Sequence, residues 1–375
     1  MNSKERVKTA LTRGCPDRAP VYAEFVPEVE ERLKKHFGMD DITEIGVALG
    51  NDMVMAGAGI GKSFYGAGEE YVCPWGCRWK YFRNSEGSYT EIIGHPLADD
   101  VDGEKLAAYR IPDPDAPGVY APVQELVRKY GDTHFIGVFL ACSIFEAGWY
   151  IRGFERTLMD MAADPDYAHA LFDKVMEFPL RAGLRMLDEG ADLIWLGDDV
   201  GMQHRMIMSV DMWRTFLKPR LAKLIASFKA KREDIIIAYH SCGYIEPIIE
   251  DLIEIGLDVL NPIQPLAMDP AVIKAKYGDR LSFWGAVCVQ ETLPKGSRED
   301  IRREIALRME TIGKGGGYMV SPAHTIQADT SVDNIFALYE AVRELGGYGE
   351  AGGAGVGGAT GEPGVGGAAG GPSGN

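Results

Sequence analysis

Short runs of apolar residues alternate along the chain with longer stretches whose apolar positions recur at helical spacing. The short runs are bounded by Gly, Pro and Asp, and their nearly unbroken apolar character is typical of strands buried on both faces of a parallel sheet. Eight runs are predicted to be strands: Ala19–Glu24, Asp52–Ala56, Phe135–Ala141, Asp192–Leu196, Ile235–His240, Asp258–Pro262, Leu281–Ala286 and Gly317–Ser321. Eight strand–helix units in one chain predict an α/β fold, the (β/α)8 TIM barrel.

Two stretches interrupt this alternation. About residues 62–130, after the second predicted strand, form an insertion with a predicted hairpin of Cys77–Phe82 and Ser88–Ile93, and connections of this length are usually lids or walls of a functional site. Residues 346–375 contain 15 of the 46 Gly and very few bulky apolar side chains. Such a segment buries too little surface to offset chain entropy, so we predict a disordered Gly/Ala-rich tail after a folded domain of residues 1–345.

Composition removes several classes of function. A formal net charge of −16 argues against a nucleic acid or an anionic membrane as partner. No stretch approaches the roughly 18 uninterrupted apolar residues of a membrane helix, and residues 1–13 read as an amphipathic helix without the apolar core of a signal peptide. Six Cys in 375 residues do not make a disulfide framework. We therefore expect a cytoplasmic protein with reduced thiols.

Side chains that can bind metal follow the ends of the predicted strands, where the active sites of barrels lie. The most specific pattern is His240-Ser241-Cys242, after the fifth strand. Residues i and i+2 of an extended strand point the same way, so His240 and Cys242 are expected to face the barrel mouth together. An imidazole beside a thiolate suits zinc, and a third ligand would come from His324 or Cys288. The alternative is a buried Cys acting as a small hydrophobe.

Three further residues are candidates for proton transfer. Asp198 and Asp199 end the fourth strand, and only one of two adjacent side chains can point inward, so we choose Asp199 as the catalytic candidate. Capping a helix is the alternative role for either carboxylate. Glu24 ends the first strand and Tyr239 precedes His240, and the same two readings apply to both.

A second pair of thiols lies in the predicted insertion. Cys73-Pro-Trp-Gly-Cys77 has the spacing C-x3-C, which is neither the C-x2-C of a thioredoxin motif nor a zinc-finger half-site. Because the pair is far from the predicted strand ends, we interpret Cys73 and Cys77 as two incidental thiols packed beside Trp75.

Four stretches in the second half of the chain carry a family resemblance: GDDVGMQHRMIMSVDMWRTFLKPR from Gly197, HSCGYIEPIIEDLIEIGLDVLNPIQP from His240, FWGAVCVQETLPKG from Phe283 and GGGYMVSPAHTIQADTSVDNIFALYEA from Gly315. Together they resemble the uroporphyrinogen decarboxylase superfamily. SKERVKTALTRGCPDRAPV from Ser3 extends the resemblance to the start of the chain. The resemblance implies a (β/α)8 barrel over about residues 1–345, as the strand count does.

The superfamily contains two chemistries. Its decarboxylases need no metal and bind a polyanionic tetrapyrrole with an Arg-rich motif of the type R-Q-A-G-R. The corresponding stretch here, Val21–Pro27, has no Arg and places Glu24 where a polycarboxylate would be repelled. Metal-free decarboxylation of a tetrapyrrole or related carboxylic acid is therefore the alternative function, and a non-catalytic barrel that binds a corrinoid or a partner is a second alternative.

The other branch contains the zinc-dependent corrinoid methyltransferases, such as methylcobamide:coenzyme M methyltransferase, and resembles this chain more closely. Its members carry H-x-C after the fifth strand, as His240 and Cys242 do, and a third zinc ligand after the last strand. That ligand is typically Cys, whereas this chain has His324. The resemblance implies Zn2+ held by His240, Cys242 and His324, with Asp199 or Tyr239 supplying a proton. It also implies methyl transfer between a small methoxylated or thiol substrate and a corrinoid on a partner protein.

Overall fold

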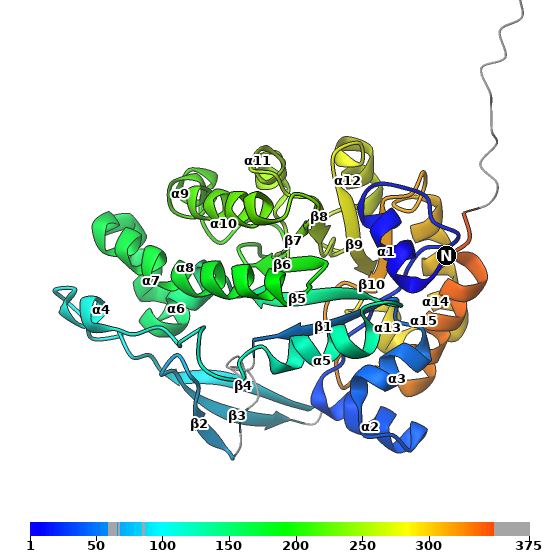
Figure 1. Cartoon of the computed structure of the whole chain (residues 1–375), viewed down its shortest axis with the longest axis horizontal. Coiled ribbons are helices and arrows are strands. Elements are labelled where there is room, and N and C mark those ends of the chain that lie inside the picture. Colours follow the sequence, from blue (N-terminus) through cyan, green and yellow to red (C-terminus); the bar gives the residue numbers. More distant parts are fainter. Residues whose placement is uncertain (59–65, 67, 85–86, 349–375) are drawn as a thin grey trace, which may run out of the picture.

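A curled, fully parallel sheet of seven strands runs through the centre of the protein, surrounded by helices (Figure 1). The computed structural model describes residues 1–58, 66, 68–84 and 87–348. The strands lie side by side in chain order and are β1 (Met53–Gly57), β5 (Phe135–Ala141), β6 (Leu193–Gly197), β7 (Ile236–His240), β8 (Val259–Asn261), β9 (Ser282–Val287) and β10 (Tyr318–Pro322). Parallel neighbours in chain order place all seven carboxyl ends at one edge of the sheet, so the loops that follow the strands gather there.

Helices connect successive strands and pack on the outer face of the curled sheet (Figure 1). None of the helices among the described residues is both long and apolar enough to cross a membrane. The helices are α1 (Ser3–Leu11), α2 (Pro27–Phe37), α3 (Ile42–Leu49), α4 (Glu104–Ala108), α5 (Ala121–Tyr130), α6 (Phe145–Arg152), α7 (Phe154–Ala163), α8 (Pro165–Asp188), α9 (Val210–Phe216), α10 (Lys218–Lys231), η1 (Glu246–Ile248), α11 (Ile249–Glu254), α12 (Pro270–Tyr277), α13 (Thr292–Lys295), α14 (Arg298–Glu310) and α15 (Val332–Leu345).

The strands divide their side chains between two buried clusters. Ile236 and Ala238 of β7 point into the curled sheet, whereas Ile237 and Tyr239 point outward against the helices, as the period of two in a strand requires. Helix α1 packs Val7 and Leu11 against the first residues of several strands, and this contact closes the amino-terminal end of the sheet. The opposite, carboxyl-terminal end is left for the site.

The first predicted strand, Ala19–Glu24, does not form a regular strand. The segment lies between β10 and β1, with single parallel bridges at Val21 and Phe25. Pro20 has no N–H to donate, and the N–H of Val21 is accepted by the side chain of Asp52, at 3.0 Å. The carboxylate of Asp52 thus takes the place of the backbone carbonyl that would accept this N–H in a regular β-ladder. The seven remaining predicted strands correspond to β1 and β5–β10, and the arrangement is compatible with a TIM barrel.

A separate three-stranded antiparallel sheet lies at the periphery, at the lower left in Figure 1. Its strands are β2 (Glu70–Val72), β3 (Arg78–Asn84) and β4 (Gly87–Gly94). Strands β3 and β4 overlap the two strands of the predicted hairpin, whereas β2 was not predicted. Residues 59–65, 67 and 85–86 of this region lie outside the described residues, as does the predicted tail from residue 349 onward.

Candidate metal centre

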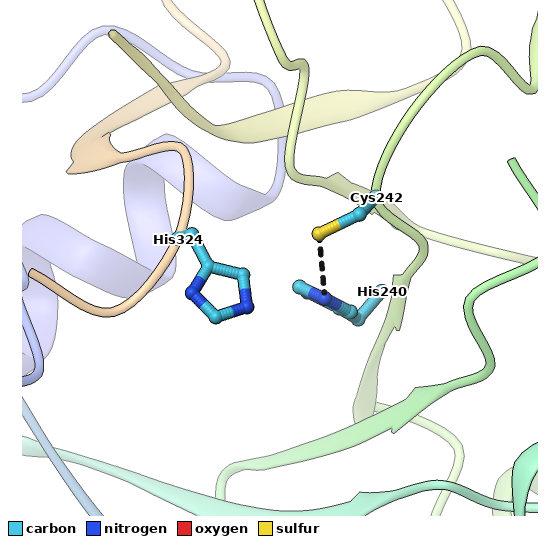
Figure 2. Close-up of side chains that lie close together, drawn as sticks. All are labelled: His240, Cys242 and His324. Atoms are coloured by element: carbon cyan, nitrogen blue, oxygen red, sulfur yellow. Dashed lines mark hydrogen bonds between the residues drawn. The ribbon is translucent and has the colours of Figure 1, made fainter. Parts of the chain in front are cut away.

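His240, Cys242 and His324 come together at the carboxyl ends of the strands (Figure 2). His240 ends β7, Cys242 follows it by two residues, and His324 lies on the loop after β10. One potential ligand atom from each residue lies within 4.8 Å of the other two. Residues 84 positions apart in the chain therefore meet in one place, because strands β7 and β10 end at the same edge of the sheet.

The separations within this group suit a tetrahedral ion with nitrogen and sulfur ligands. Sγ of Cys242 lies 3.5 Å from Nε2 of His240. In a tetrahedral zinc site, with Zn–S near 2.3 Å and Zn–N near 2.1 Å, the sulfur and a nitrogen are about 3.6 Å apart. His324 is the exposed member of the group, on a loop rather than a strand, and so has the most freedom to adjust. The residues present thus fit zinc by donor type and by spacing.

A fixed amide sets the orientation of His240. Nδ1 of His240 lies 2.7 Å from Oδ1 of Asn261, which also accepts a hydrogen bond of 3.0 Å from the indole N–H of Trp195. Nδ2 of Asn261 in turn donates to the carbonyl of Trp284, so the amide cannot be reversed without losing these bonds. Nδ1 of His240 therefore carries the proton, and the lone pair of Nε2 faces Cys242. Hydrogen bonds of this kind to the other ring nitrogen hold metal-binding imidazoles in place.

Close approach of two loops positions Cys242. A Cβ on Gly201, in the loop after β6, would come within 2.4 Å of the carbonyl oxygen of Cys242. A Cβ on Gly243 would lie 2.7 Å from the carbonyl carbon of Gly201, and Gly243 has a φ of +79°. Both positions therefore require glycine. The N–H of Cys242 also donates to Oδ1 of Asp199 over 2.8 Å, which ties the two loops together beside the thiol.

Asp198 and Asp199 take different roles, because consecutive side chains at the end of a strand point in opposite directions. Asp199 lines the cavity at the site, and its Oδ1 lies 3.5 Å from Nε2 of His240. Asp198 is fully buried and accepts hydrogen bonds of 3.0 Å from the N–H groups of Ile144 and Glu146, at the start of α6. Burial raises the pKa of Asp198 to about 7. Asp198 is thus a helix cap, and the choice of Asp199 as the residue facing the site agrees with its placement.

Glu146 of α6 also faces this cavity, and the sequence interpretation missed it. Its carboxylate accepts hydrogen bonds of 3.1 Å from the N–H of Asp199 and the hydroxyl of Tyr150. Burial, together with the charges of Asp199 and Asp198, raises the pKa of Glu146 well above its ordinary value. Its position shortly after the third predicted strand indicates the right end of the sheet, but its contact with Asp199 depends on the tertiary structure.

Glu24 also lines the same cavity. The hydroxyl of Tyr22 donates a hydrogen bond of 2.6 Å to Oε1 of Glu24. Burial raises the pKa of Glu24, and the bond from Tyr22 opposes that shift. Although the predicted first strand is absent, its last residue does reach the site.

Two other candidates are placed elsewhere. Tyr239 is fully buried on the outer side of β7, facing away from His240, and it lines neither cavity of the site. The prediction that Tyr239 supplies a proton is therefore corrected: a strand sends consecutive side chains to opposite faces. Cys288 is buried after β9 and is not part of the cluster of potential ligands found among the described residues. Of the two candidates for third ligand, the structure brings only His324 to the pair.

Two cavities adjoin the site. The first, of about 670 Å³, contains His240, His324, Asp199, Glu146 and Glu24 in its wall. The second cavity, of about 570 Å³, adjoins the first and has a mostly apolar wall. Glu24, Thr43, Met55, Phe139, Ala141, Cys142 and Tyr150 line both cavities. We call them the metal-side cavity and the apolar chamber, and both have the size of small-molecule sites.

A family model described as "Uroporphyrinogen decarboxylase (URO-D)" matches residues 83–345. Curated relatives include the uroporphyrinogen decarboxylase of Geobacillus kaustophilus, 27% identical over 47% of this chain and 50% of its own. That of Pseudomonas fluorescens is 24% identical over 71% of this chain and 73% of its own. The chain thus spans about half the length of the first curated relatives that it matches.

Among solved structures, a methyltransferase from Methanosarcina mazei has a similar fold. The two structures align with a TM-score of 0.69 and 22% sequence identity over 92% of this chain and 99% of the other. This likeness supports the shared architecture of a curled parallel sheet surrounded by helices.

Proposed function

The chain belongs to the uroporphyrinogen decarboxylase family, and we propose that it is a zinc-dependent methyltransferase with a (β/α)8 barrel. In this proposal it moves a methyl group between a small methoxylated or thiol substrate and a corrinoid carried by a partner protein. The observation that supports it most is the convergence of two imidazoles and one thiol, His240, His324 and Cys242, beside a substrate-sized cavity. Metal-free decarboxylation has no use for such a group.

The residues of the site have separate tasks in this proposal. His240, Cys242 and His324 hold the metal, and Asn261 keeps Nε2 of His240 directed toward it. When bound, zinc supplies a Lewis acid that lowers the pKa of a thiol or polarises an ether oxygen. Three protein ligands leave a fourth position for the substrate, as in catalytic rather than structural zinc sites.

Two carboxyl groups are placed to handle the proton that leaves a thiol or reaches a demethylated oxygen. Asp199 lies within 3.5 Å of the imidazole of His240 and stays there because it accepts the N–H of Cys242. Glu146 contacts the backbone of Asp199 and the hydroxyl of Tyr150. Because burial favours its neutral form, Glu146 can hold a proton behind Asp199. Glu146 thus takes the place of Tyr239 in this role, and Asp199 keeps it.

Decarboxylation remains the second candidate, because the curated relatives with the matches described above are named uroporphyrinogen decarboxylases. The walls of the two cavities weigh against a substrate with many carboxylates. They contain Glu24, Glu30, Glu146 and Asp199, and no Lys or Arg stands among the described residues that line them. A polyanion would be repelled there rather than bound.

The experiment compares the two chemistries in the same preparation. Zinc-loaded and chelator-treated protein are each incubated with a methoxylated donor and reduced cobalamin, and formation of methylcobalamin is followed by its absorption spectrum. We expect methyl transfer only in the zinc-loaded sample, with loss in Cys242→Ala and retention in Cys15→Ala, whose exposed thiol lines neither cavity. Conversion of uroporphyrinogen to coproporphyrinogen at the same rate with and without zinc would instead establish the decarboxylase and overturn the proposal.

A further inference from the structure

The apolar chamber extends the site away from the metal ligands. The residues that line the chamber but not the metal-side cavity include Cys73, Leu126, Leu140, Trp75 and Phe178, whereas His240, Cys242 and His324 do not line it. The rings of Trp75 and Phe178 meet edge to face, with centroids 5.4 Å apart. A wall of this kind binds flat apolar groups, particularly aromatic rings.

The two cavities share a charge pattern. Every charged residue among the described lining residues is acidic, apart from the imidazoles of the metal centre. A carboxylate, sulfonate or phosphate on a ligand would therefore lose its water without gaining a cationic partner away from the metal, which is costly in a buried site. The chamber accordingly selects against an anionic group on the part of the substrate that it encloses.

Glu24 and Tyr150 stand where the two cavities join. Oε1 of Glu24 is engaged by Tyr22, and the hydroxyl of Tyr150 contacts Glu146. A carboxyl group and a phenol hydroxyl thus mark the passage between the two cavities. A molecule that spans the junction would place an apolar body in the chamber and an oxygen on the metal side.

We propose, building on the methyltransferase proposal above, that the substrate of this site is an uncharged methyl aryl ether. Its ring occupies the apolar chamber, and its methoxy oxygen points through the junction toward His240, Cys242 and His324. A quaternary ammonium compound would suit the acidic and aromatic walls, but its nitrogen has no lone pair to offer a metal. The same ring bearing a carboxylate is excluded by the absence of cationic groups among the described lining residues.

Binding, measured apart from turnover, tests this inference. The probes are guaiacol, which is uncharged at neutral pH, vanillate, which adds a carboxylate to the same ring, and phenyltrimethylammonium. Affinities are measured by titration calorimetry on zinc-loaded and on metal-free protein. We expect guaiacol to bind at least tenfold more tightly than vanillate, and we expect this preference to persist without zinc because the chamber creates it. Phenyltrimethylammonium is expected to bind more weakly than guaiacol only when zinc is present, because its nitrogen has no lone pair for the metal. Equal or tighter binding of vanillate, equal or tighter binding of phenyltrimethylammonium to the zinc-loaded protein, or no binding of guaiacol would overturn the inference.

A charge placed in the wall provides the matched variant. Thr43 lines both cavities, and its side chain is half-buried, so a lysine there can keep its stem in the wall. The cap of α3 is retained, because Asp41 accepts the backbone N–H of Thr43 rather than its hydroxyl. Thr43→Lys is expected to raise vanillate affinity at least tenfold, whereas the neutral control Thr43→Met is not. Unchanged vanillate affinity in a folded Thr43→Lys protein would contradict the charge argument.

The binding measurements test the substrate class, and the turnover measurements test the methyltransferase proposal, so either can be rejected without the other. Tight guaiacol binding without methyl transfer to cobalamin would leave the substrate class standing and reject the methyltransferase. Methyl transfer from vanillate with no preference for guaiacol would keep the methyltransferase and reject the uncharged substrate.

Discussion

Among the described residues, two pairs of side chains that can bind a metal lie in structurally different regions of the protein. His240 and Cys242 sit where β7 ends, and His324 joins them from the end of β10. Cys73 and Cys77 sit in the turn between β2 and β3 of the peripheral sheet. There the N–H of Cys73 donates to the carbonyl of Cys77 over 3.0 Å, and the thiol of Cys77 donates to the carbonyl of Tyr150.

The difference shows what a metal site needs beyond a pair of ligands. The carboxyl ends of parallel strands bring side chains from distant segments to one place, so a third ligand and a cavity arise together. Among the described residues, the turn between β2 and β3 brings no third ligand to its two buried thiols, and Cys73 lines only the apolar chamber. We therefore expect metal chemistry at the first pair and structural packing at the second.

Removing one thiol from each pair gives the largest expected contrast. Cys242→Ala leaves two imidazoles and should lower zinc affinity more than a hundredfold, whereas Cys73→Ala should leave zinc content unchanged. Zinc per protein is measured by elemental analysis after dialysis against a weak chelator. Equal zinc in both variants would place the metal elsewhere and break the comparison.

The next largest effects are expected from glycine-to-alanine substitutions in the two turns, at Gly243 beside Cys242 and at Gly76 between Cys73 and Cys77. At Gly243 an added methyl meets the backbone of Gly201 at 2.7 Å, in addition to the strain of a φ of +79°. We expect Gly243→Ala to cost about 3 kcal/mol or more in unfolding free energy and to weaken zinc binding. At Gly76, with a φ of +77°, the added methyl would meet only Pro96 at an ordinary 3.6 Å.

Gly76→Ala should therefore cost about 1 kcal/mol, from backbone strain alone, and leave zinc binding intact. Urea unfolding of both variants provides the measurement. A larger loss at Gly76 than at Gly243 would contradict the account of how Cys242 is positioned.

Replacing Asn261, whose amide contacts His240, is expected to have a smaller effect on zinc affinity. Asn261→Leu removes the acceptor that holds Nδ1 of His240 and leaves the indole N–H of Trp195 without its bond. Loss of the hydrogen-bond partner of a metal-binding imidazole typically costs about 10–100-fold in metal affinity. Competition with a fluorescent zinc indicator measures this, with Asn334→Leu as a buried asparagine control remote from the site, whose amide bonds the carbonyls of Leu293 and Gly296. Wild-type affinity in folded Asn261→Leu would show that the contact is not needed.

The smallest expected effect concerns the reactivity of the hairpin pair. A hydrogen bond from Cys77 lowers the pKa of Cys73 to about 6, while the same bond and burial raise the pKa of Cys77. The thiolate fraction of Cys73 therefore rises as pH increases through about 6 and is nearly complete at neutral pH. Labelling by methyl methanethiosulfonate, located by mass spectrometry, should follow that profile at Cys73 and stay low at Cys77. A rate at Cys73 that keeps rising above pH 8 would contradict the shift.

Several of these features could be read from the sequence. Alternation of apolar runs located the seven strands of the main sheet, and the i, i+2 rule placed His240 and Cys242 on one side. The same rule, applied one residue earlier, would have turned Tyr239 outward. The segment Ala19–Glu24 was read as a strand because its apolar pattern does not reveal that Asp52 takes the N–H of Val21.

The remaining features of the site depend on contacts between residues far apart in the sequence, which local patterns do not reveal. The role of Asn261 depends on a contact with His240 on the neighbouring strand, which its own segment does not reveal. Glu146 lies in α6, and nothing in its own segment shows that it meets the backbone of Asp199. The predicted tail and part of the insertion lie outside the described residues, so their boundaries stay predictions.

The central claim is that one thiol and two imidazoles, from the ends of β7 and β10, hold a zinc ion. X-ray absorption spectroscopy at the zinc edge of the wild-type protein tests it most directly. The account predicts one sulfur at about 2.3 Å, two imidazole nitrogens at about 2.0–2.1 Å and one further light atom. A spectrum with two sulfurs, as the hairpin pair would give, or with no sulfur at all would contradict it.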